Sequence, residues 1–275
     1  MENEGMTSEV TVTSLIIYPV KSLAGIELQE SEVDNMGLKY DRRWMLVSPE
    51  GKFLSQRTLP QMALIKTEID DSEQNPRLTL SMDGKDSHIV AATDDSSEKM
   101  DVVIWGDELQ VQKVGPESDA WLSDCLGLDC HLVYIADDVM RQCDLEFAEE
   151  GEQTGFADGF PMLFVSEESL NDLNQRLDKD VDMRRFRPNV VIAGCDAYAE
   201  DELKSFSIAG VSMKGVKPCS RCPMPMVDPD LGERVGQEPI ATLSKYRKWN
   251  NKVFFGMNVI HQQQGVIRVG DSLVF

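Results

Sequence analysis

The sequence predicts a β-rich α+β protein in two parts. Strand-like runs of alternating or wholly apolar residues recur along the chain, whereas only two segments show clear helical spacing. A chain of 275 residues with 41% hydrophobic side chains can bury a large core. This length fits either one large domain or two closely packed domains.

The first half of the chain reads as a meander of short strands. β-branched and alternating patterns predict strands over residues 10–18, 43–48, 52–56, 62–69 and 78–82. A Pro-Glu-Gly turn at Pro49 separates the second strand from the third, so these two form a predicted hairpin. Residues 67–101 contain many more acidic than basic side chains, and we interpret them as a solvated edge of this part.

Two helices are predicted in the middle of the chain. Residues 117–128 place apolar side chains at helical spacing, with Ser118 as the N-cap and Gly127 as the stop. Residues 165–177 form the clearest helix, which Ser166 can cap. Its buried stripe consists of Leu170, Leu173 and Leu177. Strands are predicted over residues 130–135, 190–193, 253–260 and 266–275, with a turn at Gly270 in the last.

Charge and composition exclude several classes of protein. A formal net charge of −21 repels nucleic acid and anionic lipid, so we expect no nucleic-acid and no membrane partner. The first twenty residues lack the basic and apolar regions of a signal peptide, and no apolar run is long enough for a membrane helix. We therefore expect a cytoplasmic protein whose six cysteines are reduced.

The segment PCSRCPMPMVDPD carries a single CxxC pair, Cys219 and Cys222. A tetrahedral zinc site needs two further ligands, and no other cysteine or histidine lies at a matching spacing. A redox pair should begin a regular helix, which the nearby prolines disfavour. Two unreactive buried thiols are the remaining simple interpretation. The flanking cations Lys217 and Arg221 favour instead a thiolate that binds a soft metal.

Other cations are placed where chain reversals can direct them into one pocket. Most of them follow an apolar or strand-like run, in a chain otherwise dominated by acids. Each alone could be a solvated surface base, but together they indicate a pocket for a phosphate-bearing ligand. The residues in these segments are Lys21, Ser22, Arg42, Arg43, Arg57, Arg184, Arg185 and Arg187. The sequence has no glycine-rich phosphate loop, so a nucleotide-binding fold is not indicated.

Seven motifs in a fixed order give a resemblance to a known family. They are IYPVKS, GLKYDRRW, FLSQR, FADGFP, FRPN, PCSRCPMPMVDPDLG and GVIRVGD. The sequence resembles MOSC proteins that have an N-terminal MOSC β-barrel domain followed by a MOSC domain. The resemblance implies such a domain over residues 8–118, packed on a MOSC β-barrel domain over residues 119–275. Relatives in this family include the mitochondrial amidoxime-reducing components and bacterial proteins that reduce N-hydroxylated bases such as 6-hydroxylaminopurine.

The resemblance also implies a ligand, the molybdenum cofactor (Mo-molybdopterin). It makes Cys222 the metal ligand, Cys219 a structural residue, and Asp228 an acid near the metal. Gly159 and Phe160 stand where the animal proteins have Thr-Ser, so only backbone contacts to the cofactor are expected there. The other implied cofactor-binding residues, with Arg57 added from the basic cluster, are Lys21, Ser22, Arg42, Arg57, Arg187, Asn189, Ser220 and Arg221.

The implied activity is reduction of small N-hydroxylated compounds by oxygen-atom transfer to molybdenum. Asp228 would either carry protons or only anchor its neighbours. The chain shows no membrane anchor and no ferredoxin domain, so we expect electrons from a separate protein: a ferredoxin, a flavodoxin or a flavoprotein reductase. Two alternatives remain: a molybdenum-cofactor carrier or sulfur-handling protein without reductase activity, and a zinc-stabilised binding protein.

Overall fold

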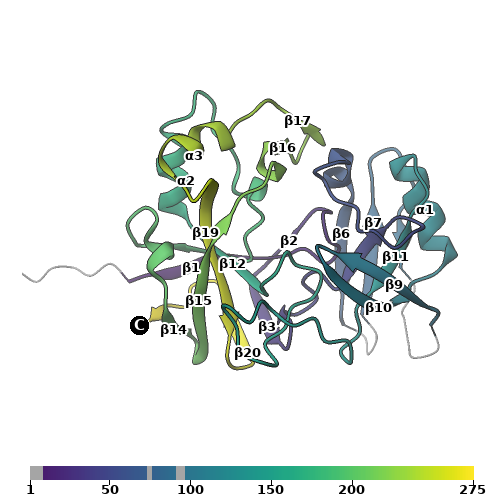
Figure 1. Cartoon of the computed structure of the whole chain (residues 1–275), viewed down its shortest axis with the longest axis horizontal. Helices are drawn as coiled ribbons and strands as arrows, with labels where there is room; N and C mark the ends of the chain where they lie inside the picture. Colours follow the sequence, from purple (N-terminus) through teal and green to yellow (C-terminus); the bar gives the residue numbers. More distant parts are fainter. Residues whose placement is uncertain (1–8, 73–75, 91–96) are drawn as a thin grey trace, which may run out of the picture.

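Strands dominate the computed structural model, which describes residues 9–72, 76–90 and 97–275 (Figure 1). The left-hand part of Figure 1 is built on a nine-stranded sheet. Its strands, in spatial order, are β2 (Ile26–Leu28), β1 (Thr11–Ile17), β13 (Val190–Ala193), β12 (Met162–Ser166), β19 (Lys252–His261), β15 (Val211–Ser220), β14 (Ser205–Ile208) and β21 (Leu273–Val274), with β18 (Lys248–Trp249) paired to β19. The β-rich α+β prediction is confirmed.

Smaller sheets complete both parts of the molecule. The right-hand part of Figure 1 contains β5 (Trp44–Val47), β11 (His131–Tyr134), β10 (Asp107–Lys113) and β9 (Lys99–Ile104), paired in that order. A second sheet there joins β6 (Lys66–Asp70), β7 (Arg77–Ser81) and β8 (His88–Ile89). The left-hand part also contains the sheet of β20 (Gly265–Arg268), β3 (Glu30–Asp34) and β4 (Gly37–Leu38), and the hairpin of β16 (Val227–Asp228) and β17 (Glu233–Arg234).

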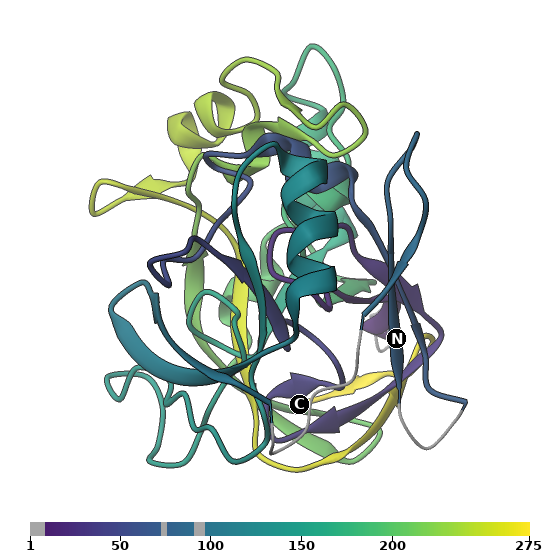
Figure 2. The ribbon, with the colours of Figure 1, turned by 90° about the vertical axis from the view of Figure 1, so that its right-hand side faces the viewer.

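Helices are short in the described residues. The α-helices are α1 (Pro116–Leu126), α2 (Glu167–Asn174) and α3 (Ile240–Tyr246). The 3-10 turns are η1 (Pro60–Leu64), η2 (Met183–Arg185), η3 (Ala199–Glu202) and η4 (Met224–Met226). Seen from the right-hand end, α1 stands in front of its sheet and contacts β11 (Figure 2). None of the helices in these residues has the length and apolarity needed to cross a bilayer.

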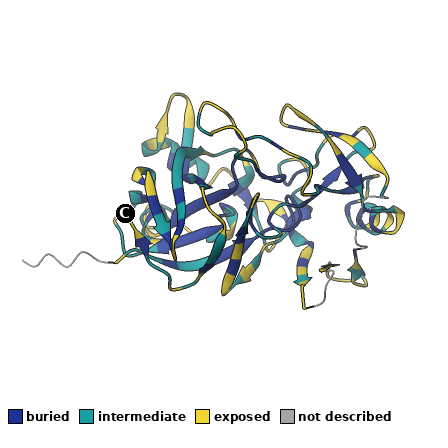
Figure 3. Cartoon of the chain, turned by 90° about the horizontal axis from the view of Figure 1, so that it is seen from below, coloured by how far each residue is buried: buried dark blue, intermediate teal, exposed yellow. Residues whose placement is uncertain are grey.

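Each part has its own hydrophobic core, and buried residues follow the strands whereas exposed ones gather on loops and hairpins (Figure 3). Leu15, Phe164 and Val259 are fully buried members of the core of the large sheet. Leu46 and Leu122 belong to the core beneath α1. Because these strands bury their side chains, their sequences are apolar, and this apolar pattern predicted the strands.

The chain does not divide simply at one point. β1 pairs with β13 and β3 pairs with β20, so the first strands complete sheets formed by the second half of the chain. The predicted boundary between residues 118 and 119 falls inside α1. The division into residues 8–118 and 119–275 therefore stays a prediction. The strand order shows that β1 and β3, from the beginning of the chain, belong to sheets of the second part.

Several local predictions are confirmed. The strands expected over residues 10–18, 43–48, 78–82, 130–135 and 190–193 are present with ends shifted by one residue at most. Ser166 caps α2 by accepting a hydrogen bond from the backbone N–H of Ser169 at 3.1 Å. Gly127 ends α1 in the left-handed conformation, with φ of 70°.

Three local predictions are wrong, each for a local reason. Residues 62–69 do not form one strand, because Pro60 starts the 3-10 turn η1 and β6 begins only at Lys66. Residues 52–56 make isolated bridges to β5 and β9 instead of a strand, and a turn at Ser55 then redirects the chain. Ser118 is not the N-cap of α1: Gly115 holds that position, because the following proline, Pro116, starts the helix.

The predicted stripe of α2 is only partly right. The helix ends at Asn174, so Leu177 lies beyond it. Leu173 is fully buried, whereas Leu170 and Leu177 are partly buried against the same core. Part of the acidic stretch 67–101 lies outside the described residues; its described acids Asp70 and Asp83 are exposed, as expected for a solvated edge.

Candidate functional site

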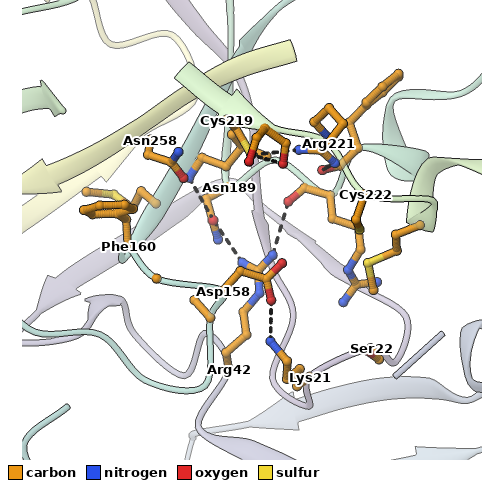
Figure 4. A pocket seen from close by; sticks show the side chains of 18 residues that line it. Lys21, Ser22, Arg42, Asp158, Phe160, Asn189, Cys219, Arg221, Cys222 and Asn258 are labelled. Atoms are coloured by element: carbon orange, nitrogen blue, oxygen red, sulfur yellow. Dashed lines mark hydrogen bonds and ion pairs between the residues drawn. The ribbon is translucent and has the colours of Figure 1, made fainter. Parts of the chain in front are cut away.

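A pocket lies where the end of β1, the loop before β12 and the end of β15 come together (Figure 4). Ten of the predicted site residues line it: Lys21, Ser22, Arg42, Gly159, Phe160, Arg187, Asn189, Ser220, Arg221 and Cys222. These residues come from five separate motifs of the sequence. The fold therefore brings Lys21, Arg42 and Arg187 to the same place as the CxxC pair.

Backbone hydrogen bonds after β1 position the first of these side chains. The N–H of Lys21 donates to the carbonyl of Trp44 at 2.8 Å, and the N–H of Arg42 donates to the carbonyl of Tyr18 at 2.9 Å. Three lining residues adopt positive φ: Ser22 (69°), Arg42 (47°) and Arg187 (56°). Non-glycine residues seldom adopt this conformation, so the sharp reversals at the pocket are held by the surrounding structure.

Asn189 and Arg42 form the floor of the pocket. Arg42 Nη1 donates to Asn189 Oδ1 at 2.9 Å and to Asp41 Oδ2 at 2.6 Å. Asn189 Oδ1 also accepts from the N–H of Leu163, and its Nδ2 donates to the carbonyl of Ile16. Because both ends of the Asn189 amide are engaged, this residue fixes the position of Arg42 relative to β1 and β12.

Two guanidinium groups enclose the ring of Tyr18. The central guanidinium carbons of Arg42 and Arg187 lie 4.3 and 4.0 Å from the ring centroid. Burial raises the pKa of Tyr18 to about 12, although both arginines oppose the rise. Burial also lowers the pKa of Arg187 to about 10, which still leaves it charged at neutral pH.

Lys21 is paired with Asp158, an acid that is not among the predicted site residues. Its ammonium donates to Asp158 Oδ1 at 2.6 Å and to the carbonyl of Phe156 at 2.7 Å. Burial lowers the pKa of Lys21, and Asp158 counteracts this. Lys21 and Arg42 hold the pKa of the exposed Asp158 carboxyl well below the usual range. The pair is therefore ionised at neutral pH.

The CSRC segment forms the opposite wall. The N–H of Arg221 donates to the carbonyl of Val253 at 2.7 Å, which extends the pairing of β15 with β19 by one residue. The Arg221 side chain donates to the carbonyl of Phe186 at 2.8 Å and to Cys219 Sγ at 3.2 Å. Both Cys219 and Cys222 are free thiols that line the pocket.

The pocket contains buried polar atoms that have no partner. Within the described residues, Ser22 Oγ, Arg187 Nη2 and Arg221 Nε are buried and make no hydrogen bond. Such atoms are costly unless a ligand satisfies them. Two of them belong to arginines, so the missing partner is an acceptor, and an anionic group such as a phosphate suits them best. The donor set therefore fits a phosphate-bearing ligand that places a soft metal beside Cys222.

Two predicted residues lie outside the lining. Arg57 stacks on Trp105, with its guanidinium carbon 4.3 Å from the ring centroid. Asp228 pairs with Arg185 at 2.7 Å and accepts the backbone N–H groups of Asp230 and Leu231. Neither side chain is among those that surround the pocket. Their predicted roles at the cofactor stay predictions.

Two further cations of the basic segments, Arg43 and Arg184, also have partners outside the pocket. Arg43 binds the carbonyl of Ile135, and Arg184 pairs with Asp182 and Asp230. Among the described residues, no three histidine, cysteine or acidic side chains converge on a point that could hold a metal by themselves. The zinc interpretation of the CxxC pair gains no support from this arrangement.

Several lining residues were missed by sequence reasoning. They are Ala157, Asp158, Met162, Leu163, Phe186, Met224 and Asn258. Asp158 lies inside the motif FADGFP, which the sequence analysis used for its resemblance, so a signal for it was present. Ala157, Phe186 and Met224 also lie inside quoted motifs, but buried and pocket-lining apolar side chains look alike in a sequence, so their position gave no sign of the pocket.

Comparison with known proteins gives two family matches. Residues 9–129 match the MOSC N-terminal beta barrel domain, and residues 151–274 match the MOSC domain. Mitochondrial amidoxime-reducing component 1 of Mus musculus is 34% identical over 281 residues, which are 96% of this chain and 81% of the relative. The protein of the same name from Homo sapiens is 34% identical over 280 residues, 96% of this chain and 82% of that protein.

A relative of a different kind also matches. The molybdenum cofactor sulfurase of Oryza sativa subsp. japonica is 32% identical over 275 residues. The match covers 91% of this chain but only 32% of the sulfurase. The chain therefore corresponds to about a third of that protein.

Proposed function

Because the chain belongs to the family of proteins that combine a MOSC N-terminal beta barrel domain with a MOSC domain, we propose that it is a molybdenum-cofactor-dependent reductase of N-hydroxylated compounds. The observation that carries the proposal is the set of unpartnered donors on Ser22, Arg187 and Arg221, which line the same pocket as the Cys222 thiol. The names of the amidoxime-reducing relatives support the same reaction class.

In this proposal the side chains divide into two groups. Ser22, Arg187 and Arg221 have donors free to bind the phosphate end of the cofactor. Arg42 and Asn189 are already hydrogen-bonded to each other, so they hold the floor of the pocket and contribute charge and shape. Lys21, Gly159, Phe160 and Ser220 line the remaining surface, and Cys222 supplies the thiolate ligand.

The cofactor, when bound, would supply the two-electron chemistry that these side chains lack. The net reaction consumes an N-hydroxylated compound, two electrons and two protons, and it yields the amine and water. The electrons would come from a separate redox protein, namely a ferredoxin, a flavodoxin or a flavoprotein reductase. The protein side chains would bind the cofactor and orient the N–OH group toward the Cys222 side of the pocket.

Metal and pterin content tests the first step of the proposal. We would express the wild type, Cys222→Ser and Cys219→Ser in a host that makes the cofactor. Molybdenum and pterin in the wild type and Cys219→Ser, with molybdenum lost in Cys222→Ser, are expected. Zinc without pterin, lost in both variants, would rule the proposal out.

A second candidate function is a cofactor carrier or sulfur-handling protein, which the match to the sulfurase favours. Reduction of 6-hydroxylaminopurine by the loaded protein, with a chemical electron donor, separates the two. Multiple turnovers support the reductase. A protein that holds the cofactor stoichiometrically, yet reduces no N-hydroxylated compound, would instead be a carrier.

A further inference from the structure

Trp105 occupies an unusual position at the tip of the β9–β10 hairpin. The two-residue connection between Ile104 and Asp107 consists of Trp105 and Gly106. Trp105 has φ of 61°, a conformation that normally selects glycine at this turn position, yet it carries the largest side chain available. Although the residue is apolar, 48% of its surface remains exposed.

Two neighbours hold the indole in place without burying it. The guanidinium carbon of Arg57 lies 4.3 Å from the ring centroid of Trp105, and the Phe53 ring centroid lies 5.1 Å away at an angle of 48°. Phe53 belongs to the segment that bridges β5 and β9, and Arg57 follows it in the turn at Ser55. A cation over an aromatic face is attractive, so Arg57 and Phe53 hold the Trp105 indole in one orientation.

This surface adjoins the candidate site. Trp105 Nε1 donates a 3.3 Å hydrogen bond to Asp158 Oδ1, the same atom that accepts from Lys21 at 2.6 Å. Lys21 Nζ lies 6.0 Å from the Trp105 ring centroid. Because Asp158 and Lys21 both line the pocket, the indole lies immediately outside the lining on their side.

The hairpin itself has no need of a tryptophan. Glycine would adopt the same backbone conformation without strain, and the exposed indole adds little to the core. Strain and exposed apolar surface together, beside a ligand pocket, are features of sites that contact a ligand. Flat aromatic surfaces backed by arginine stack on planar heterocycles, irrespective of the hydrogen bonds that the heterocycle makes.

We propose that Trp105 is a specificity-determining residue whose exposed indole stacks on the planar ring of heteroaromatic N-hydroxylated substrates. The ring would rest on the surface formed with Arg57 while the N–OH group enters the pocket past Asp158. Small aliphatic N-hydroxylated compounds have no ring to stack, so they gain nothing from this surface. The inference rests on the proposed reductase function, because that function defines the substrate class.

Equilibrium binding to the oxidised, cofactor-loaded protein tests the inference without turnover. Calorimetric titration with 6-hydroxylaminopurine and with acetamidoxime would compare the wild type with Trp105→Gly and Trp105→Phe. Glycine relieves the backbone strain and removes the ring, so this variant is expected to fold. Phenylalanine keeps a ring but loses the N–H that contacts Asp158. Trp121→Ala is the control, since Trp121 lies on α1 and stacks on His88.

For 6-hydroxylaminopurine, Trp105→Gly is expected to raise the dissociation constant about tenfold, whereas Trp105→Phe should raise it by less than about threefold. Binding of acetamidoxime should change by less than about twofold in every variant. Equal weakening of both compounds, unchanged purine binding in Trp105→Gly, or no purine binding to the wild type would each overturn the inference.

Binding and reduction assays on the same proteins distinguish a failure of this inference from a failure of the proposed function. A wild type that binds 6-hydroxylaminopurine through Trp105, but does not reduce it when electrons are supplied, would contradict the reductase and leave the stacking surface standing. A wild type that reduces both compounds with kcat/KM values that Trp105→Gly leaves unchanged would support the reductase and reject the role of Trp105.

Discussion

The Lys21 ammonium and the Asp158 carboxylate form an ion pair 2.6 Å long between residues that are 137 positions apart. Only 7% of the Lys21 side chain is exposed, whereas 65% of the Asp158 side chain is. The buried Lys21 ammonium therefore lies at the candidate pocket, and the Asp158 carboxylate neutralises its charge from the solvent side.

Asp158→Asn should destabilise the protein by about 1–3 kcal/mol at pH 7, because it leaves the buried Lys21 without its counter-ion. The pKa of Asp158 is depressed in the folded protein, so its stabilising effect is complete above the unfolded pKa of about 4. The effect is lost as the pH falls below that value toward the folded pKa. Denaturant unfolding of both proteins at pH 7 and pH 3 should show the difference shrinking; a constant difference would contradict this assignment.

Asn189→Ala should cost about 2–4 kcal/mol of stability, since Asn189 is buried and its amide links Arg42, Leu163 and Ile16. Urea unfolding measures the loss. Asn174→Ala provides a comparison, because that amide makes two hydrogen bonds to Val181 alone. A smaller loss at Asn189 than at Asn174 would mean that the pocket floor does not depend on this network.

Arg221→Lys should lower molybdenum content roughly tenfold at limiting cofactor, because lysine keeps the charge but loses the planar group that contacts Phe186 and Cys219. Arg176→Lys, which changes an exposed pair with Asp172, is the matched control. Elemental analysis of the purified proteins gives the result. Equal molybdenum in both variants would remove Arg221 from the cofactor-binding set.

Asp228→Asn separates the two roles considered for this acid. Asp228 pairs with the buried Arg185 and accepts two backbone N–H groups, so an anchoring role predicts a loss of about 1–3 kcal/mol in stability. It also predicts an unchanged pH profile of N-hydroxy reduction. If the profile shifted while stability stayed constant, Asp228 would be a proton carrier instead.

Gly256→Ala should destabilise the protein by about 2–5 kcal/mol, from the positive φ of 80° and from crowding inside the large sheet. A methyl group there would lie 2.8 Å from the Phe164 carbonyl oxygen and 2.8 Å from Val165 Cγ2. Gly84→Ala has nearly the same φ but open space, so it should cost only about 1–2 kcal/mol. Thermal unfolding of both variants checks the difference, and equal losses would mean that crowding contributes nothing.

Local sequence patterns predicted much of the fold and the pocket. The strand over residues 190–193 and the Ser166 cap depend on neighbouring residues alone, so they could be read directly. The local predictions that were wrong concern alternatives that such patterns do not distinguish, namely a strand or a 3-10 turn and two possible helix starts. An apolar run such as that after Pro60 suits a 3-10 turn as well as a strand, and Pro116 competes with Ser118 for the start of α1.

The sequence by itself determined which residues could meet in a pocket, because cations and the CxxC pair at strand ends are local features. Only the tertiary structure decided that β1 pairs with β13, that Asp158 reaches Lys21, and that Arg57 stacks on Trp105. These contacts join segments far apart in the chain, and their geometry depends on strand pairing and burial across the whole molecule. No spacing within a single motif encodes that information.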